Sequence, residues 1–258
     1  MSILRPLVFS VIFAVSTGAH TSPIIFFGED INLSDNPSTP QDDPIRLLSM
    51  PNSTSAQSAF LSNLIGVTTE QFEGFSDGDN PTTLTFGSDT ATLIGGPTIK
   101  TVTSGTFNGT YPISGDNFLF HFGPAGSFRI DFSSPQAAFG FFATDVGDGG
   151  AQLILDLVLS SGGTETINVP HTTGSPTVIT SGSVFFFGLI DTSNTFTSIS
   201  FTNTNASQDG FGFDDMTIGR LENVVISEPS SIILLIAGVV GVFTVARRST
   251  NHISIKPA

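Results

Sequence analysis

From Phe72 onward, hydrophobic side chains recur at every second position in short runs. The clearest runs cover residues 118–122, 128–132 and 153–159, and phenylalanine or leucine occupies most of the alternating positions. Successive side chains of a β-strand point to opposite faces, so this period of two indicates strands and excludes amphipathic helices here. The pattern predicts about nine or ten short strands between residues 71 and 222.

Turn residues separate these runs. Gly, Ser and Asp lie between residues 84–86 and 91–93, which predicts a hairpin, and Ser161-Gly162-Gly163 follows the leucine-rich run. Many short strands at this spacing are typical of an antiparallel β-sandwich. The chain has 25 phenylalanines, and we expect most of them on the inward faces, where they fill the space between the two sheets.

Residues 20–70 differ from the sandwich in composition. Ile24–Gly28 is a short apolar run that we interpret as a strand, and residues 35–52 are rich in Pro, Ser, Asn and Asp, which predicts a loop. Residues 55–65 form the one soluble helix expected, with Phe60 and Leu64 on its apolar face, Ser53 or Ser55 as cap, and Gly66 after its end. We expect this accessory helix to pack on an edge or end of a sheet.

The last predicted strand contains adjacent carboxylates where its alternation changes parity. Phe211 and Phe213 are odd-numbered, whereas Met216 and Ile218 are even-numbered. A change of parity within one strand requires a β-bulge, which must fall at Asp214-Asp215. Two adjacent carboxylates with few basic neighbours repel each other unless a cation or several N–H donors bind them.

An early Phe-Glu-Gly and a closing Phe-Asp-Asp-hydrophobe strand resemble jelly-roll carbohydrate-binding modules. These residues are 72–74 and 213–216 here. In that family the first and last strands share a structural calcium, so the resemblance implies a jelly-roll-like sandwich with Glu73 and Asp214 or Asp215 as calcium ligands. Hydrogen-bonded or solvated carboxylates are the alternative, and no other cofactor is expected.

Residues 1–19 have the three parts of a secretory signal peptide. Arg5 supplies the positive charge, Leu7–Val15 is an apolar stretch too short to span a membrane, and Thr17-Gly18-Ala19 is a small-residue cleavage site. We therefore expect cleavage after Ala19, with an uncleaved N-terminal anchor as the alternative. In either case most of the chain is exported.

The segment 225–248 has the composition of a stop-transfer sequence. An uncharged apolar run, Ile232–Ala246, follows Glu228-Pro229 and ends at Arg247-Arg248. Hydrocarbon accepts such a run, whereas the guanidinium groups stay in cytoplasmic water. This predicts a transmembrane helix at 232–246 and a cytoplasmic tail at 249–258. The run is short, so a buried core helix is the alternative.

This segment resembles the PEP-CTERM sorting signal of bacteria that make extracellular polysaccharide. Ser227-Glu228-Pro229, the apolar helix and Arg247-Arg248 occur in the family's order, with serine in place of the first proline and ten residues after the arginines. The resemblance implies an exosortase, a membrane protease or transpeptidase, as partner, with cleavage near Glu228-Pro229. It also implies transient attachment to the inner membrane of a Gram-negative-type bacterium, then release to the periplasm, outer surface or extracellular matrix.

Composition excludes several functions. Between residues 20 and 226 there are 21 acidic and four basic residues, a formal charge of −17, which repels nucleic acid. The absence of cysteine excludes disulfides and thiolate metal sites. H-E-x-x-H does not occur, and the single G-x-S-x-G match, at residues 74–78, falls in a stretch that we interpret as a turn, so we expect no enzymatic activity.

These observations together predict an exported protein of the cell envelope or extracellular matrix with a structural role. The alternative is a calcium-dependent carbohydrate-binding module that acts on extracellular polysaccharide. Trp is absent and Tyr111 is the one tyrosine, which speaks against a sugar-binding platform because sugar rings usually stack on those side chains.

Overall fold

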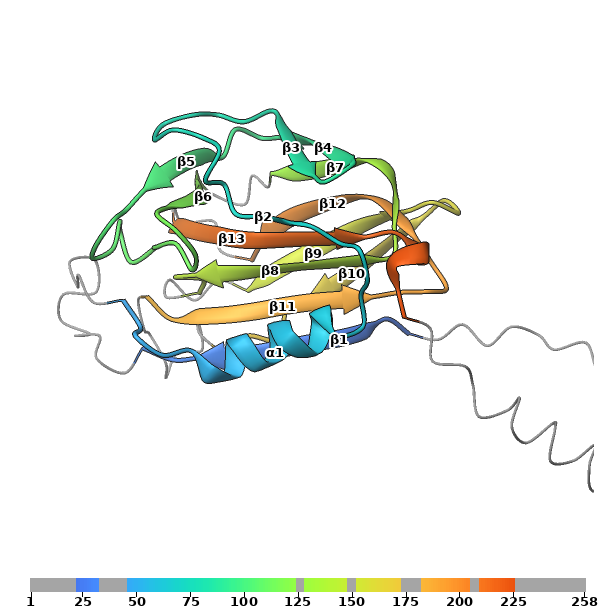
Figure 1. The fold of residues 1–258 in the computed structure, drawn as a ribbon, viewed down its shortest axis with the longest axis horizontal. Helices are drawn as coiled ribbons and strands as arrows, with labels where there is room; N and C mark the ends of the chain where they lie inside the picture. The colour runs from blue at the N-terminus through green and yellow to red at the C-terminus, as the bar shows by residue number, and fades with distance from the viewer. Residues whose placement is uncertain are drawn as a thin grey trace, which may run out of the picture.

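The computed structural model describes residues 22–32, 46–123, 128–147, 152–172, 182–204 and 209–225. These residues form two antiparallel sheets, one α-helix and one short 3-10 helix (Figure 1). The predicted all-β sandwich with a short accessory helix is therefore confirmed. The signal peptide and the segment 232–246 lie outside the described residues, and no described helix is long and apolar enough to cross a membrane.

The larger sheet has seven strands. Its order is β1-β11-β8-β13-β6-β5, and the short β2 pairs with one end of β13. The strands are β1 (Ile24–Asp30), β2 (Thr69–Glu70), β5 (Thr98–Thr101), β6 (Asn117–Gly123), β8 (Ala138–Thr144), β11 (Val184–Ile190) and β13 (Asp209–Gly219). Because β1 and β2 belong to this sheet, the segment 20–70 contributes strands to the sandwich as well as the helix.

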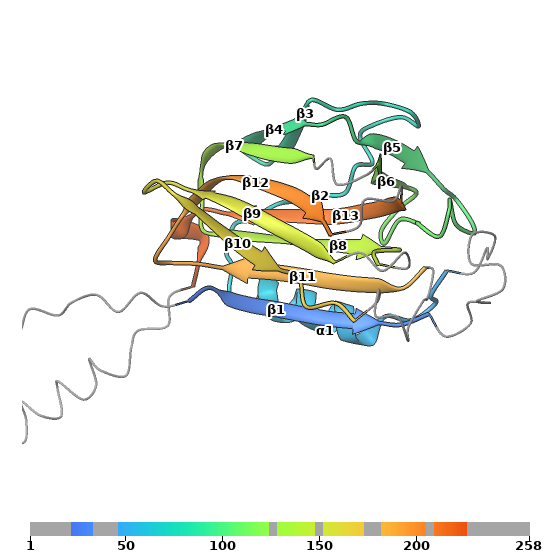
Figure 2. The same cartoon turned by 180° about the vertical axis from the view of Figure 1, so that it is seen from behind.

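The second sheet has six strands in the order β10-β9-β12-β7-β4-β3. Its strands are β3 (Thr83–Phe86), β4 (Asp89–Ile94), β7 (Arg129–Gln136), β9 (Leu153–Leu159), β10 (Thr164–Asn168) and β12 (Phe196–Asn203). The predicted hairpin at 84–93 is confirmed as β3–β4, closed by the Phe86–Asp89 pair. The sheets lie face to face in both views (Figures 1 and 2).

Phenylalanine rings fill the space between the sheets. Phe128, Phe141, Phe201 and Phe213 are buried there, and the Phe128 and Phe201 rings stack with centroids 4.2 Å apart. Offset-stacked and edge-to-face aromatic pairs stabilise a core by about 0.5–1.5 kcal/mol beyond their buried area. The sandwich is therefore held mainly by aromatic contacts between sheets.

The outer face of the seven-stranded sheet is also apolar. Every residue of β8 and β11 is buried, because α1 (Pro51–Leu61) packs across β1, β8 and β11 and covers this face (Figure 1). Phe60 of α1 contacts the rings of Phe26 and Phe186. The helix therefore lies on a sheet face, above the edge strand β1 and its neighbours, so the packing at an edge expected from the sequence is correct in part.

The helix also begins and ends earlier than predicted. It starts at Pro51, whose missing N–H is harmless in a first turn. The expected serine cap is absent, and the Asp30 carboxylate instead caps the first turn by accepting from the N–H groups of Asn52 at 3.2 Å and Ser53 at 2.8 Å. Ser53 is inside the helix and donates its hydroxyl to the Asp30 carboxylate at 2.7 Å. Leu64 lies beyond the helix, in an isolated bridge with Val224.

Candidate functional site

The predicted bulge in β13 is confirmed. Register against β8 shifts between Asp214 and Thr217, and Asp215 has φ of +49°. Before the bulge β13 pairs with β6, and after the bulge it pairs with β2. The shift keeps Phe213 and Met216 both in the core, as the change of parity required.

Asp214 is buried and binds backbone N–H groups. Its carboxylate accepts hydrogen bonds from the N–H of Ile113 at 2.7 Å, of Ser114 at 3.1 Å and of Asp215 at 2.7 Å. Burial, and secondly the neighbouring Asp215, raise the pKa of Asp214 well above its ordinary range, and the three N–H donors oppose that rise. The carboxyl group therefore ties the bulge to the loop before β6.

Asp215 and Glu73 bind the same loop. Asp215 accepts from the Ser114 hydroxyl at 2.6 Å, and Glu73 accepts from the N–H groups of Asp116 at 2.9 Å and Asn117 at 2.8 Å. A Cβ at Gly115 would lie 2.3 Å from a Glu73 oxygen, so only glycine fits there. The three carboxylates named by the sequence thus converge on residues 113–117, which we call the carboxylate-bound loop.

Two residues that lie close to this loop in space, but far from it in the sequence, have an unusual backbone conformation. Besides Asp215, Phe72 has a positive φ, +62°, although its side chain is fully buried. A bulky residue at positive φ is uncommon and persists only where the surroundings impose it. Here the Phe72 C=O accepts from the Asn117 side chain, and the Phe72 N–H donates to Glu70.

The chemistry of this site matches one of the two arrangements that the sequence allowed. Backbone N–H groups and the Ser114 hydroxyl donate to the three carboxylates. Among the described residues there is no group of three or more His, Cys, Asp or Glu side chains that could hold a metal ion. Calcium binding by Glu73, Asp214 and Asp215 stays a prediction.

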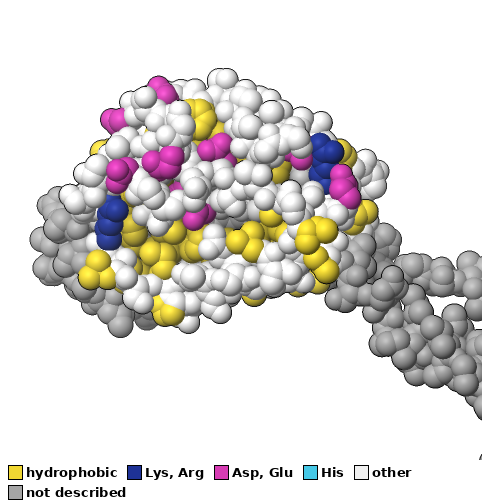
Figure 3. Space-filling view, in the orientation of Figure 1, with side chains coloured by type: hydrophobic (Ala, Val, Ile, Leu, Met, Phe, Trp, Pro, Cys, Tyr) yellow, Lys and Arg dark blue, Asp and Glu magenta, His cyan; other side chains and the backbone are white. Residues whose placement is uncertain are grey.

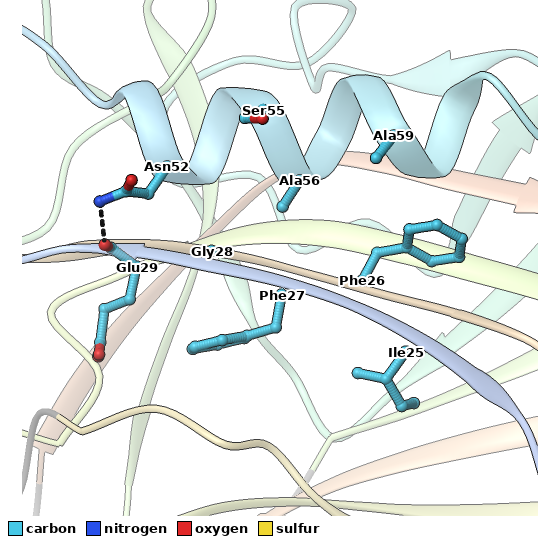
Figure 4. Close-up of a pocket in the computed structure, with 9 residues that line it drawn as sticks. All are labelled: Ile25, Phe26, Phe27, Gly28, Glu29, Asn52, Ser55, Ala56 and Ala59. Carbon is cyan, nitrogen blue, oxygen red and sulfur yellow. Dashed lines mark hydrogen bonds between the residues drawn. The ribbon is translucent and has the colours of Figure 1, made fainter.

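A groove between α1 and β1 was not predicted from the sequence. It has a volume of about 580 Å³ and runs along the outer edge of β1 (Figure 4). At one end the Asn52 side chain donates to the Glu29 C=O at 3.0 Å. Small side chains on the helix leave the groove open, and a Cβ at Gly28 would collide with the Asn52 C=O. Its lining residues are Ile25, Phe26, Phe27, Gly28, Glu29, Asn52, Ser55, Ala56 and Ala59.

A small aromatic patch lies on the outer face of β6. The Phe120 and Phe122 rings stack with centroids 6.3 Å apart, and Phe122 is 53% exposed. Phe107 meets Phe120 edge-on, and the Lys100 ammonium lies 4.8 Å from the Phe107 ring centroid. These phenylalanines are an exception to the inward placement expected from the sequence.

The two described histidines have structural surroundings. His171 is buried, accepts from the Leu153 N–H through Nε2 at 2.9 Å, and stacks on Phe185. His121 packs against the Phe128 ring.

The processing residues lie outside the described part of the chain. These are Ala19 at the signal cleavage site and Ser227, Glu228, Pro229, Arg247 and Arg248 in the sorting segment. Their roles stay predictions from the sequence.

No protein-family profile and no curated protein matches this sequence. Similar solved structures include the K2 cleaved adhesin domain of Lys-gingipain, with 16% identity, a TM-score of 0.37, and coverage of 59% of this chain and 97% of that chain. Another is the C-terminal family 22 carbohydrate-binding module of Clostridium thermocellum Xyn10B, with 12% identity, a TM-score of 0.33, and coverage of 61% and 94%. The family 29 module CBM29-2 has 14% identity, a TM-score of 0.29, and coverage of 63% and 96%. With TM-scores below 0.5, these similarities carry no argument about function.

Proposed function

We propose that this chain is an exported structural component of the cell envelope or extracellular matrix, sorted through its C-terminal segment. The observation that carries the proposal is the order of three parts: Ser227-Glu228-Pro229, the uncharged run Ile232–Ala246, and Arg247-Arg248. An exosortase would be the processing partner. We expect no catalytic activity.

The arrangement of the folded domain supports this proposal. The last described residue, Val225, donates its N–H to the Asn63 C=O at 2.8 Å, so the first residue of the sorting segment is still bonded to the domain. Both ends of the described chain lie at the same end of the sandwich (Figures 1 and 2). A membrane helix after Val225 would therefore hold the domain by the end from which the cleaved signal peptide also leaves, with the other end facing outward.

Cell fractionation tests the sorting role. Cells express the full chain, a chain without residues 227–258, and a variant with Arg247→Leu and Arg248→Leu. We expect the two altered proteins to miss the membrane intermediate and to differ from the full chain in mature mass or compartment, because nothing then stops transfer at the arginines. Lys256→Leu, in the tail, is the matched control and should behave like the full chain. The same compartment and mature mass for all four proteins would refute the sorting role.

Polysaccharide binding is a second candidate, favoured by the aromatic patch on β6. An exposed ring such as Phe122 offers a flat apolar face on which a sugar ring can stack, and Lys100 adds a positive charge in an otherwise acidic domain. In a polysaccharide pull-down, Phe122→Ala should reduce retention, whereas Ile65→Ala, at another exposed apolar side chain, should not. Retention equal for both variants would refute this site.

Calcium dependence is tested separately. Titration calorimetry with calcium should give heat, and the melting temperature should rise, if Glu73, Asp214 and Asp215 hold the ion. Glu73→Gln should abolish both effects. No heat and no rise in melting temperature for the unaltered protein would refute the calcium site while leaving the sorting proposal untouched.

A further inference from the structure

The four long edges of the two sheets differ in how they are protected. Exposed strand edges offer unpaired N–H and C=O groups to other chains, and proteins usually blunt them with short strands or charges. β3 and β5 are four residues long, and β5 carries Lys100. β10 places Glu165 within its five residues. By contrast, β1 is seven residues long and has no charge from Ile24 to Gly28.

The outer edge of β1 presents backbone groups for pairing. The Asp191 N–H donates to the Ala137 C=O. In the register of β11 with β8, the backbone N–H and C=O groups of odd-numbered β11 residues therefore point toward β8, and those of even-numbered residues point toward β1. Even-numbered residues of β1 pair with even-numbered residues of β11, so their backbone groups bond to β11. The N–H and C=O groups of the odd-numbered Ile25 and Phe27 therefore point away from the sheet. The Glu29 C=O, which accepts from Asn52, has the same outward direction. No described strand pairs with this side of β1.

The surroundings of this edge leave room for another strand. The groove of about 580 Å³ follows the edge, and the helix side that borders it carries only Asn52, Ser55, Ala56 and Ala59. Ile24 and Ile25 are 57% and 39% exposed. Figure 4 shows Ala56 and Ala59 pointing from α1 toward β1, so that side of the helix carries no bulky side chain. A groove formed by an edge strand and a helix suits the addition of an extended strand.

We propose that a second copy of this chain occupies the groove, so that two β1 strands pair antiparallel about a two-fold axis at Phe27. Each Phe27 then pairs with its counterpart, and Ile25 of one copy lies opposite Glu29 of the other. Roughly six backbone hydrogen bonds would form, and the two seven-stranded sheets would become one continuous sheet.

The distribution of charge permits a second copy at this edge and favours this register. The domain is strongly acidic, so two copies approach with least repulsion at a surface without charge, and the segment Ile24–Gly28 is such a surface. Glu29 faces an isoleucine rather than a second glutamate, and the two Glu29 residues are four positions apart along the strands, about 14 Å. Charges at that distance are largely screened at physiological ionic strength, where the Debye length is about 8 Å. Glu29 is also engaged by the Thr172 N–H and hydroxyl.

Site-specific cross-linking of the full chain tests this register. The chain has no cysteine, so introduced thiols are the only ones present. In membranes of expressing cells, the double variant Ile25→Cys with Glu29→Cys should be joined by a short bismaleimide into a species of twice the monomer mass. Each single variant should give at least tenfold less, because neither position faces itself across the axis. Equal yields for double and single variants would overturn the proposal.

Sedimentation of the detergent-solubilised full chain provides a second measurement. We expect a dimer for the unaltered protein and a monomer for Ile25→Lys, since a lysine on the edge blocks strand pairing. Ile94→Lys, at a 41% exposed isoleucine on the interior strand β4, is the matched control and should stay dimeric. A monomeric unaltered protein, or a dimer that Ile25→Lys leaves intact, would overturn the proposal. So would association only with a different protein that competes for the groove.

Discussion

The two sheets of the sandwich share a core but differ in their outer faces. In the six-stranded sheet, β3 and β4 alternate strictly between buried and exposed residues, β9 alternates between buried and partly buried residues as far as Leu157, and β10 has no buried residue. In the seven-stranded sheet, β8 and β11 are buried throughout. The first sheet faces solvent on its outer side, whereas the second is covered there. The domain therefore has a third layer on one side only.

The covering layer is itself divided into two parts. α1 lies over β1, β8 and β11. Before and within the carboxylate-bound loop, Thr110 and Ile113 lie against Gly212 and Asp214 of β13, and Phe107 contacts Phe120 of β6. Figure 3 shows this face, with hydrophobic side chains along the middle and acidic side chains to one side of them. Because α1 and this loop bury the outer face of the seven-stranded sheet, their side chains belong to the hydrophobic core. Substitutions on the covered face should therefore cost far more stability than substitutions on the open one.

The largest effect is expected from Phe60, the residue by which α1 covers the sheet. Phe60→Ala should lower the free energy of unfolding by about 3–5 kcal/mol, because its ring is fully buried between Phe26 and Phe186. Val158→Ala, at a 40% exposed position on the outer face of the six-stranded sheet, should change it by less than about 0.5 kcal/mol. Denaturant unfolding followed by circular dichroism measures both. Similar losses for the two variants would contradict the difference between the faces.

A smaller effect is expected where the sheet makes room for that ring. A Cβ at Gly188 would lie 2.8 Å from the Phe60 ring, so Gly188→Ala should lower the free energy of unfolding by about 1–3 kcal/mol through overpacking. Gly74→Ala is the control, since nothing lies within 4 Å of its Cβ.

A double-mutant cycle sharpens this prediction. In the Phe60→Ala background the space is empty, so Gly188→Ala should then lower the free energy of unfolding by much less than it does alone. Additive losses would mean that the glycine does not serve to accommodate the ring.

Much of the two-layer part of this fold could be predicted from the sequence, whereas the third layer could not. Alternation in residues 128–132 and 153–159 identifies strands with one polar face, and the change of parity from Phe213 to Met216 is enough to locate the bulge. β11, with its run Val184–Ile190, lacks such alternation, because a strand buried on both faces has no polar side to reveal its period. The position of α1 on those strands depends on contacts distant in sequence, such as Gly28 with Asn52.

The candidate sites show the same division. The change of parity in the last strand singles out Asp214 and Asp215, and the resemblance to carbohydrate-binding modules singles out Glu73. Their N–H partners in residues 113–117 carry no side-chain signal. The groove along β1 is not predicted from the sequence. It forms because the small side chains of Ser55, Ala56 and Ala59 lie next to a strand about thirty residues earlier in the chain, and this contact leaves no local pattern.

The covered face should also give the protein a dependence on pH. A carboxyl group whose pKa is raised by folding binds its proton more tightly in the folded state. Its contribution to the free energy of unfolding is therefore present at low pH and is lost as pH rises through the raised pKa. For Asp214 this loss begins near the ordinary pKa of 3.8 and continues upward, at a slope of at most about 1.4 kcal/mol for each step of one in pH. Asp214→Asn should remove this decline from a plot of unfolding free energy against pH. A plot of unchanged slope would show that Asp214 keeps an ordinary pKa.

The smallest effect is expected from the equivalent charge on the solvent-facing sheet. Asp131 forms an ion pair with Arg129 at 2.8 Å on β7, and the two side chains are 36% and 48% exposed. Water and salt screen such a pair, so Asp131→Asn should change the free energy of unfolding by less than about 0.5 kcal/mol, and less still at high salt. The same substitution, aspartate to asparagine, is thus compared on a covered and an uncovered face by the same unfolding measurement. If Asp131→Asn altered the pH dependence as strongly as Asp214→Asn, burial under the carboxylate-bound loop would not be what distinguishes the two carboxyl groups.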